Sequence, residues 1–191
     1  MLSAIIATHE SERALVPTLS ALVPAVTTGL LREVIVADAA SRDATAEVAE
    51  VAGCHFMSSY EPLGARLKAA AAQTRSPWLM FLRAGMVPEP GWIAAAERFM
   101  QTAEMAEKPR AAVFRPPDVS DLMRPGLAEI LAMLRVALGG APRSEQGLLI
   151  ARRFYEALGG HAGAAQAETA LLRKLGRRRV TMLSAGINIV R

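Results

Sequence analysis

The sequence is poor in cysteine, histidine and aromatic residues, and each shortage excludes a class of protein. The single cysteine, Cys54, rules out a disulfide framework and any cysteine-rich zinc or iron–sulfur site. The three histidines, His9, His55 and His161, are scattered without the spacing of a histidine metal site. Aromatic residues are 5% of the chain, too few for the stacking platforms that bind single-stranded nucleic acid.

The sequence also lacks a run of apolar residues long enough for a membrane-spanning helix, which requires about 20 of them. The uncharged stretch over residues 14–31 contains Pro17, Pro24 and Gly29, which disfavour such a helix. The first residues reach Glu10 without a basic segment and so do not resemble a secretory signal. We therefore expect a cytoplasmic protein that makes at most peripheral contact with the inner face of a membrane.

What is present is a hydrophobic and mildly basic chain. With 191 residues, 52% of them hydrophobic, the chain is long enough for one substantial core. Its net charge of +4 suits phosphorylated small molecules, anionic membranes or nucleic acid. Nucleic acid is not expected, because the sequence carries no helix-turn-helix, RNP or zinc signature. The densest cations, Arg173, Lys174 and residues 177–179, form either a solvated helix end or a patch for phosphate or a membrane surface.

Strand and helix signals alternate in the first half of the chain. Apolar runs predict strands over residues 2–7, 33–37, 54–57 and 78–82. Helical periodicity predicts helices over residues 10–25, 41–52 and 64–74. The first of these helices could instead begin near Val16, with Pro17 in its first turn. Such alternation is typical of a parallel sheet with helices on both faces.

The second half is predicted to contain shorter elements. Helices are expected over residues 90–103, 122–138, 152–158 and 168–175, and strands over residues 111–115, 147–151 and 179–183. No internal repeat or low-complexity linker separates the two halves. We therefore expect a single domain over residues 1–191.

Candidate ligand contacts follow the predicted strands, because open α/β sheets bind ligands beyond the carboxyl ends of their strands. Asp38 could accept a hydrogen bond from a nucleobase or a ribose hydroxyl, or it could cap the next helix. Ser41 could border the same ligand or begin that helix. Gly64 would let the backbone approach a ligand, and Arg66 is either a phosphate contact or part of a solvated helix face. The chain has neither a Walker A motif nor a glycine-rich dinucleotide fingerprint after its first strand.

Several segments also follow a family pattern in order. Residues 34–45 run from an apolar strand through Asp38, and residues 78–85 run from a second strand into Arg83-Ala84-Gly85. The ordered set is completed by residues 3–10, 62–70, 88–92 and 146–153 with 158–160. This set resembles the family-2-like glycosyltransferases of the GT-A fold. The resemblance implies a GT-A-like α/β single domain with a mostly parallel central sheet and helices on both faces.

The resemblance further implies a nucleotide-diphospho-sugar as substrate, held by residues 1–86, with residues 87–191 on the acceptor side. Asp38 would hold the base, and Arg66 would lie near the diphosphate. Positions matched to the substrate are Thr8, Glu10, Asp38, Ser41, Gly64, Arg66 and Gln146. Glu168 matches the catalytic base of the family, although an acid at the start of a helix is also favoured by the helix dipole.

One departure from the family pattern concerns its metal. The family uses two carboxylates to hold Mg²⁺ or Mn²⁺ against the diphosphate, and here Arg83 and Gly85 stand at those positions. An arginine cannot ligate a cation, so we expect no metal cofactor.

Two functional interpretations follow from that departure. In one, Arg83 clamps the diphosphate and Glu168 deprotonates the acceptor in a metal-independent, inverting transfer. In the other, the protein is a catalytically degenerate nucleotide-sugar binder or an interaction scaffold. In either case a homodimer or a membrane-associated enzyme could complete the acceptor side.

Overall fold

The first half of the chain folds into parallel strands joined by helices, as the sequence predicts. This computed structural model describes residues 1–106, 108–116, 144–163 and 166–190. Four strands pair in parallel in the order β3-β2-β1-β4, namely β1 (Leu2–Thr8), β2 (Leu31–Asp38), β3 (His55–Ser58) and β4 (Trp78–Arg83). The helices between them are α1 (Glu12–Thr27), α2 (Thr45–Val51) and α3 (Leu63–Gln73).

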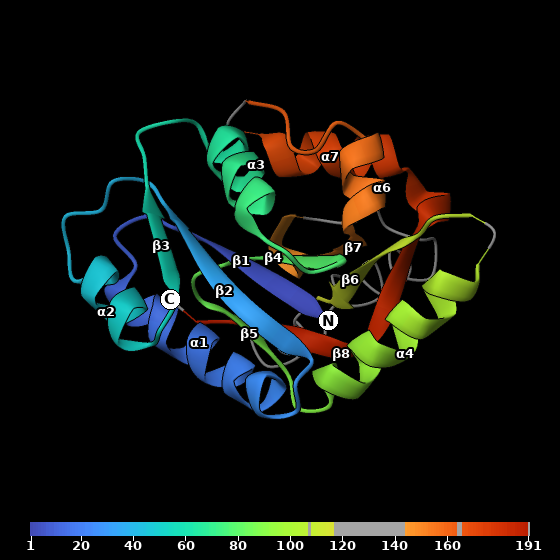
Figure 1. The fold of residues 1–191 in the computed structure, drawn as a ribbon, viewed down its shortest axis with the longest axis horizontal. Helices are drawn as coiled ribbons and strands as arrows, with labels where there is room; N and C mark the ends of the chain where they lie inside the picture. Colours follow the sequence, from blue (N-terminus) through green and yellow to red (C-terminus); the bar gives the residue numbers. More distant parts are fainter. Residues whose placement is uncertain (107, 117–143, 164–165, 191) are drawn as a thin grey trace, which may run out of the picture.

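The second half extends the same sheet beyond β4 (Figure 1). Its strands are β5 (Met86–Pro88), β6 (Ala111–Arg115), β7 (Leu148–Ala151) and β8 (Val180–Ile189). Its helices are α4 (Trp92–Met105), η2 (Ser144–Gln146), α6 (Arg152–Ala157), α7 (Ala167–Leu175) and η3 (Arg177–Arg179). The full strand order is β3-β2-β1-β4-β7-β6-β8-β5, with β7 antiparallel to both of its neighbours and β6 parallel to β8. The helix predicted over residues 122–138 lies outside the described residues.

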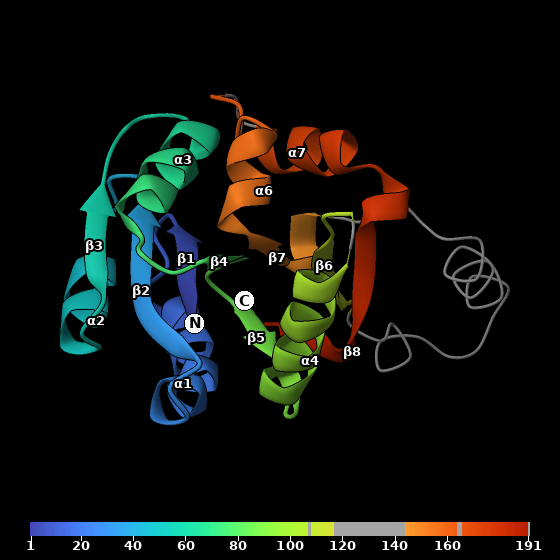
Figure 2. The same ribbon diagram turned by 45° about the vertical axis from the view of Figure 1, so that its right-hand side comes forward.

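Helices cover both faces of the sheet and create two hydrophobic cores (Figures 1 and 2). Alternate residues of β1 point to opposite faces, so Ala4 and Ile6 join one core while Ile5 and Ala7 join the other. The first core lies under α1, α2 and α4, and the second under α3, α6 and α7. All seven residues of β1 are buried, which explains why this strand reads as a continuous apolar run.

No helix in the described part of the chain is both long enough and apolar enough to cross a membrane.

The starts of α1 and α2 differ from the predictions. Helix α1 begins at Glu12 and carries Pro17 and Pro24 inside it, so a start near Val16 is wrong. Helix α2 begins at Thr45, so Ser41 is not its N-cap. The neighbouring loop decides where both helices begin, because side chains at the end of the loop before α2 accept hydrogen bonds from the first backbone N–H groups of α1. That pairing could not be seen in either segment alone.

Candidate functional site

The carboxyl ends of β1, β2 and β4 bring three predicted site residues together. Thr8, Asp38 and Arg83 are each the last residue of their strand. In the parallel register, Thr8 lies beside Asp38 and Ala7 lies beside Arg83. This is the edge at which an open α/β sheet binds its ligand.

Asp38 is completely buried, and protein donors surround its carboxylate. Oδ1 accepts hydrogen bonds from the hydroxyls of Thr8 at 2.8 Å and Ser41 at 2.6 Å. Oδ2 accepts from the Ser41 N–H at 2.8 Å and the Ser58 hydroxyl at 3.3 Å. Burial raises the pKa of Asp38, but the hydrogen bonds from Ser41, Thr8 and Ser58 outweigh it and leave the pKa below its ordinary value. The carboxylate fixes this strand end, and its contact with a base stays a prediction.

The Asp38 contacts lead to an expected pH dependence. The folded-state pKa lies below the unfolded value of about 3.9, so the stabilising contribution is complete above that value and is lost as the pH falls through the folded-state pKa. Asp38→Asn should therefore destabilise the protein at pH 7 and by a smaller amount near pH 3. Urea unfolding at the two pH values measures this. Glu47→Gln, on the exposed side of α2, is the control, and an Asp38→Asn deficit that does not change with pH would contradict the assignment.

The loops after β1 and β2 are tied into one unit. The Glu10 N–H donates to the Ser41 hydroxyl at 2.8 Å, and the Arg42 N–H donates to the Glu10 carboxylate at 2.8 Å. The Glu12 N–H donates to Asp43 at 3.0 Å, which caps the start of α1. Glu10 and Ala40 both adopt positive φ angles, of 47° and 55°, which non-glycine residues rarely do. Glu10 and Ser41, both expected to border a ligand, thus lie together.

Arg66 reaches from α3 to the same strand ends. Its Nη1 donates to the backbone carbonyl of Ala37 and, at 3.4 Å, to that of Thr8. Its Nε donates to the carbonyl of Glu61 at 3.1 Å. These bonds hold a positive charge beside Asp38, where the diphosphate was expected, and the phosphate contact itself stays a prediction.

Gly64 and Gln146 have structural roles that the sequence did not reveal. A Cβ atom at Gly64 would lie 1.6 Å from the Ala162 carbonyl oxygen and 2.5 Å from the Ala167 Cβ. Glycine is therefore required where α3 packs against the start of α7, and this accounts for Gly64 without a ligand. Gln146 is buried, and its Nε2 donates to the Phe114 carbonyl at 2.9 Å. Its predicted contact with substrate is not tested by this geometry.

The two predicted catalytic residues meet at the end of β4. Arg83 donates to the Glu168 carboxylate from Nε, at 3.2 Å, and from Nη2, so the pair is bidentate. This hydrogen bonding raises the pKa of Arg83 against the opposing effect of burial. The Arg83 side chain is 42% exposed and that of Glu168 is 13% exposed. A ligand can therefore reach the guanidinium from solvent, whereas most of the carboxylate side chain is buried.

Gly85 is held so tightly that the position cannot carry a larger side chain. Its φ angle is 89°, and a Cβ atom there would lie 2.3 Å from the Val190 carbonyl oxygen. Its N–H donates to the Ala14 carbonyl and the Thr18 hydroxyl, each at 2.9 Å, and its carbonyl accepts from the Val190 N–H at 2.8 Å. An aspartate at this position would require the last residues of the chain to move.

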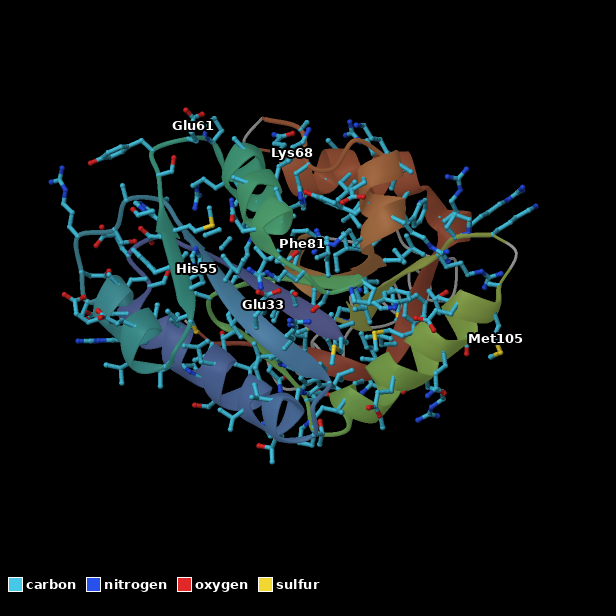
Figure 3. The ribbon with its side chains drawn as sticks, in the orientation of Figure 1. Glu33, His55, Glu61, Lys68, Phe81 and Met105 are labelled. Atoms are coloured by element: carbon cyan, nitrogen blue, oxygen red, sulfur yellow. The ribbon has the colours of Figure 1, made fainter. Side chains whose placement is uncertain are left out.

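A buried polar cluster beside β4 was not predicted from the sequence. The His161 Nδ1 lies 3.0 Å from the Tyr155 hydroxyl oxygen, which also accepts from the His161 N–H at 3.2 Å. The rings of both pack on Phe81, labelled in Figure 3. Burial lowers the pKa of His161 to about 4 and raises that of Tyr155 to about 12, so both are neutral at pH 7. The available sequence signal was the Gly159-Gly160 pair between Tyr155 and His161, which turns the chain back.

A family model matches the part of the chain that builds the parallel strands. The model for glycosyl transferase family 2 matches residues 3–112, which is more than half of the chain. The chain belongs to glycosyltransferase family 2. The resemblance seen in the sequence is thereby confirmed, and the match covers β1 from Ser3 onward, β2, β3 and β4 and the loops between them.

Solved structures of a glucosyl-3-phosphoglycerate synthase match the whole chain. Glucosyl-3-phosphoglycerate synthase from Mycobacterium tuberculosis, with Mn²⁺, UDP and glucosyl-3-phosphoglycerate, superimposes with a TM-score of 0.74 at 19% identity. That match covers 100% of this chain and 72% of the synthase. The same enzyme with Mg²⁺ and UDP gives a TM-score of 0.73 at 20% identity, with the same coverage. These matches confirm the GT-A-like α/β fold. No curated protein matches the sequence.

The comparisons correct the expectation that no metal cofactor takes part. The similar synthase structures hold Mn²⁺ or Mg²⁺ together with UDP. The residues at the end of β4 do not fit such an ion, because Arg83 is cationic and Gly85 has no space for a carboxylate. Among the described residues, no group of three histidine, cysteine, aspartate or glutamate side chains is placed to hold a metal. We therefore assign no catalytic step to a metal at the end of β4.

Proposed function

We propose that this family-2 protein transfers a sugar from a UDP-sugar to an acceptor hydroxyl, with inversion at the sugar carbon. The observation that carries the proposal is the Arg83–Glu168 pair, in which a guanidinium and a carboxylate lie side by side at the end of β4. UDP is the nucleotide held by the similar synthase structures.

Residues 1–86 would bind the donor. The base would lie over the strand ends of Thr8 and Asp38, with the ribose near the tied loops. Arg66, over the ends of β1 and β2, and Arg83, at the end of β4, would both approach the diphosphate. A guanidinium suits that role, because its planar donors bind phosphate oxygens in pairs and remain charged at every relevant pH.

Residues 87–191 would contribute the acceptor side and the base. Glu168 would take the proton of the acceptor hydroxyl as that oxygen bonds to the sugar carbon and the bond from this carbon to the diphosphate breaks. UDP would leave with its new negative charge beside Arg83. The ion pair must open first, because the Arg83 Nε and Nη2 donors stay on the Glu168 carboxylate until the diphosphate takes them over.

A degenerate nucleotide-sugar binder is the second candidate. It is favoured by the end of β4, where Arg83 and Gly85 stand at the positions of the family's two metal-binding carboxylates and Gly85 has no space for a larger side chain. Such a protein would bind UDP with saturation and transfer no sugar. A pure scaffold would bind neither UDP nor its sugar conjugates.

Calorimetric titration of UDP, UDP-glucose and GDP tests the proposal. We expect saturable binding of UDP and of UDP-glucose. Each titration is run with Mn²⁺, with Mg²⁺ and with EDTA, so that the effect of the divalent cation on the affinity is measured. Arg66→Ala should weaken binding about 10-fold to 100-fold, the equivalent of one charged hydrogen bond of about 1.5–3 kcal/mol. Lys68→Ala, exposed on the same helix, is the matched control. Absence of binding in every condition would rule out both the enzyme and the binder.

A further inference from the structure

A second charged surface lies at the edge of the sheet opposite the donor site. Strands β6 and β8 run in the same direction as β4, because β7 is antiparallel to β4 and to β6, and β6 is parallel to β8. Their first residues therefore lie at the edge where the parallel strands begin, which we call the amino edge, on the right in Figure 1. The proposed donor site lies at the opposite, carboxyl edge of the sheet. Any charge gathered at this amino edge is remote from the diphosphate.

Five exposed cations gather at that edge. Lys108 and Arg110 precede β6, and residues Arg177–Arg179 form η3 directly before β8. Because Ala111 pairs with Val180, the residues before these two strands are neighbours. None of the five forms an ion pair with a carboxylate of the described residues. We call these five residues the cationic edge.

Apolar side chains are exposed next to the cationic edge. Met105, at the end of α4, is 81% exposed, and Met182 of β8 is 48% exposed. Figure 3 shows Met105 projecting away from the body of the molecule. Between α4 and β8 lies a groove of about 630 Å³, lined by Phe99 and both methionines, with Arg98 and Arg110 also on its walls.

We propose that the cationic edge and its two methionines bind the surface of an anionic lipid membrane. Arginine and lysine side chains bind lipid phosphates, and each such residue near an anionic surface strengthens binding about fivefold. Flexible methionine side chains can enter the apolar layer just below the headgroups. A nucleic acid would use the cations but would gain nothing from exposed methionines beside a groove. Binding at this edge would leave the donor site at the other edge open to solvent.

Sedimentation with lipid vesicles tests the proposal. The intact protein should bind vesicles of phosphatidylcholine with phosphatidylglycerol, should not bind phosphatidylcholine alone, and should be released as salt shortens the screening length. The triple charge reversal Arg177→Glu, Arg178→Glu and Arg179→Glu should weaken binding about 100-fold or more. Met105→Asp should weaken it without changing the basic residues.

A matched control separates this surface from net charge alone. Arg178→Glu and Arg13→Glu change the charge equally, and Arg13 lies on α1 with its side chain 95% exposed. Only Arg178→Glu should reduce vesicle binding, with circular dichroism verifying that both variants fold. Equal losses from both variants would overturn the proposal, as would a lack of binding to anionic vesicles at low salt. It would also be overturned if an RNA oligonucleotide displaced the vesicles and bound Met105→Asp as tightly as it binds the unmodified protein.

Discussion

Glu168→Gln should lower the turnover number for sugar transfer about 10²-fold to 10⁴-fold, the usual contribution of a general base. Glutamine keeps the shape of the side chain and an oxygen that can accept from Arg83, but it cannot take a proton from the acceptor. Because the glutamine is neutral, it also competes less with the diphosphate for the guanidinium. We therefore expect UDP to bind at least as tightly to Glu168→Gln as to the unmodified protein.

The measurement pairs steady-state turnover with calorimetric UDP binding, and Glu145→Gln is its control. Glu145 also attracts Arg83 electrostatically but makes no hydrogen bond to it in the described structure. Its neutralisation should leave turnover nearly unchanged. Undiminished turnover in Glu168→Gln would remove Glu168 as the base, whereas UDP binding without turnover in the unmodified protein would favour the degenerate binder.

Gly64→Ala should lower the free energy of unfolding by about 3 kcal/mol or more, the upper range for overpacking a filled interior. The added methyl group would lie 1.6 Å from a backbone carbonyl oxygen, which cannot move aside as a flexible side chain can. For a protein of this size, each kcal/mol corresponds to about 2–4 °C in the melting temperature. Thermal and urea unfolding measure the loss.

Gly163→Ala is the matched glycine control for that change. It lies in the segment that packs against Gly64, and its added methyl group would meet no atom within 4 Å. Its melting temperature should change little. Similar losses in both variants would mean that the contact between α3 and the segment before α7 is not the cause. Because α7 carries Glu168, Gly64→Ala should also disturb the Arg83–Glu168 pair.

Apolar runs predicted the parallel half of the sheet well, for a simple reason. Strands buried on both faces are mostly apolar, so β1 and β4 are visible in the sequence without knowledge of their neighbours. Three-residue β5 has no such signal, because its pairing with the end of β8 joins residues about a hundred positions apart. The ends of helices were less predictable, since α1 and α2 are capped by each other's loops.

The candidate site, like the fold, could be predicted from the sequence only in part. The sequence alone placed Thr8, Asp38 and Arg83 directly after predicted strands, and parallel strands have their carboxyl ends at one edge. Only the tertiary structure decided what each side chain contacts. The Arg83–Glu168 pair joins residues 85 positions apart, and Asp38 is satisfied by hydroxyls from three separate segments. Hydrogen bonds and ion pairs depend on distances of a few ångströms, which folding sets and no local pattern in the chain records.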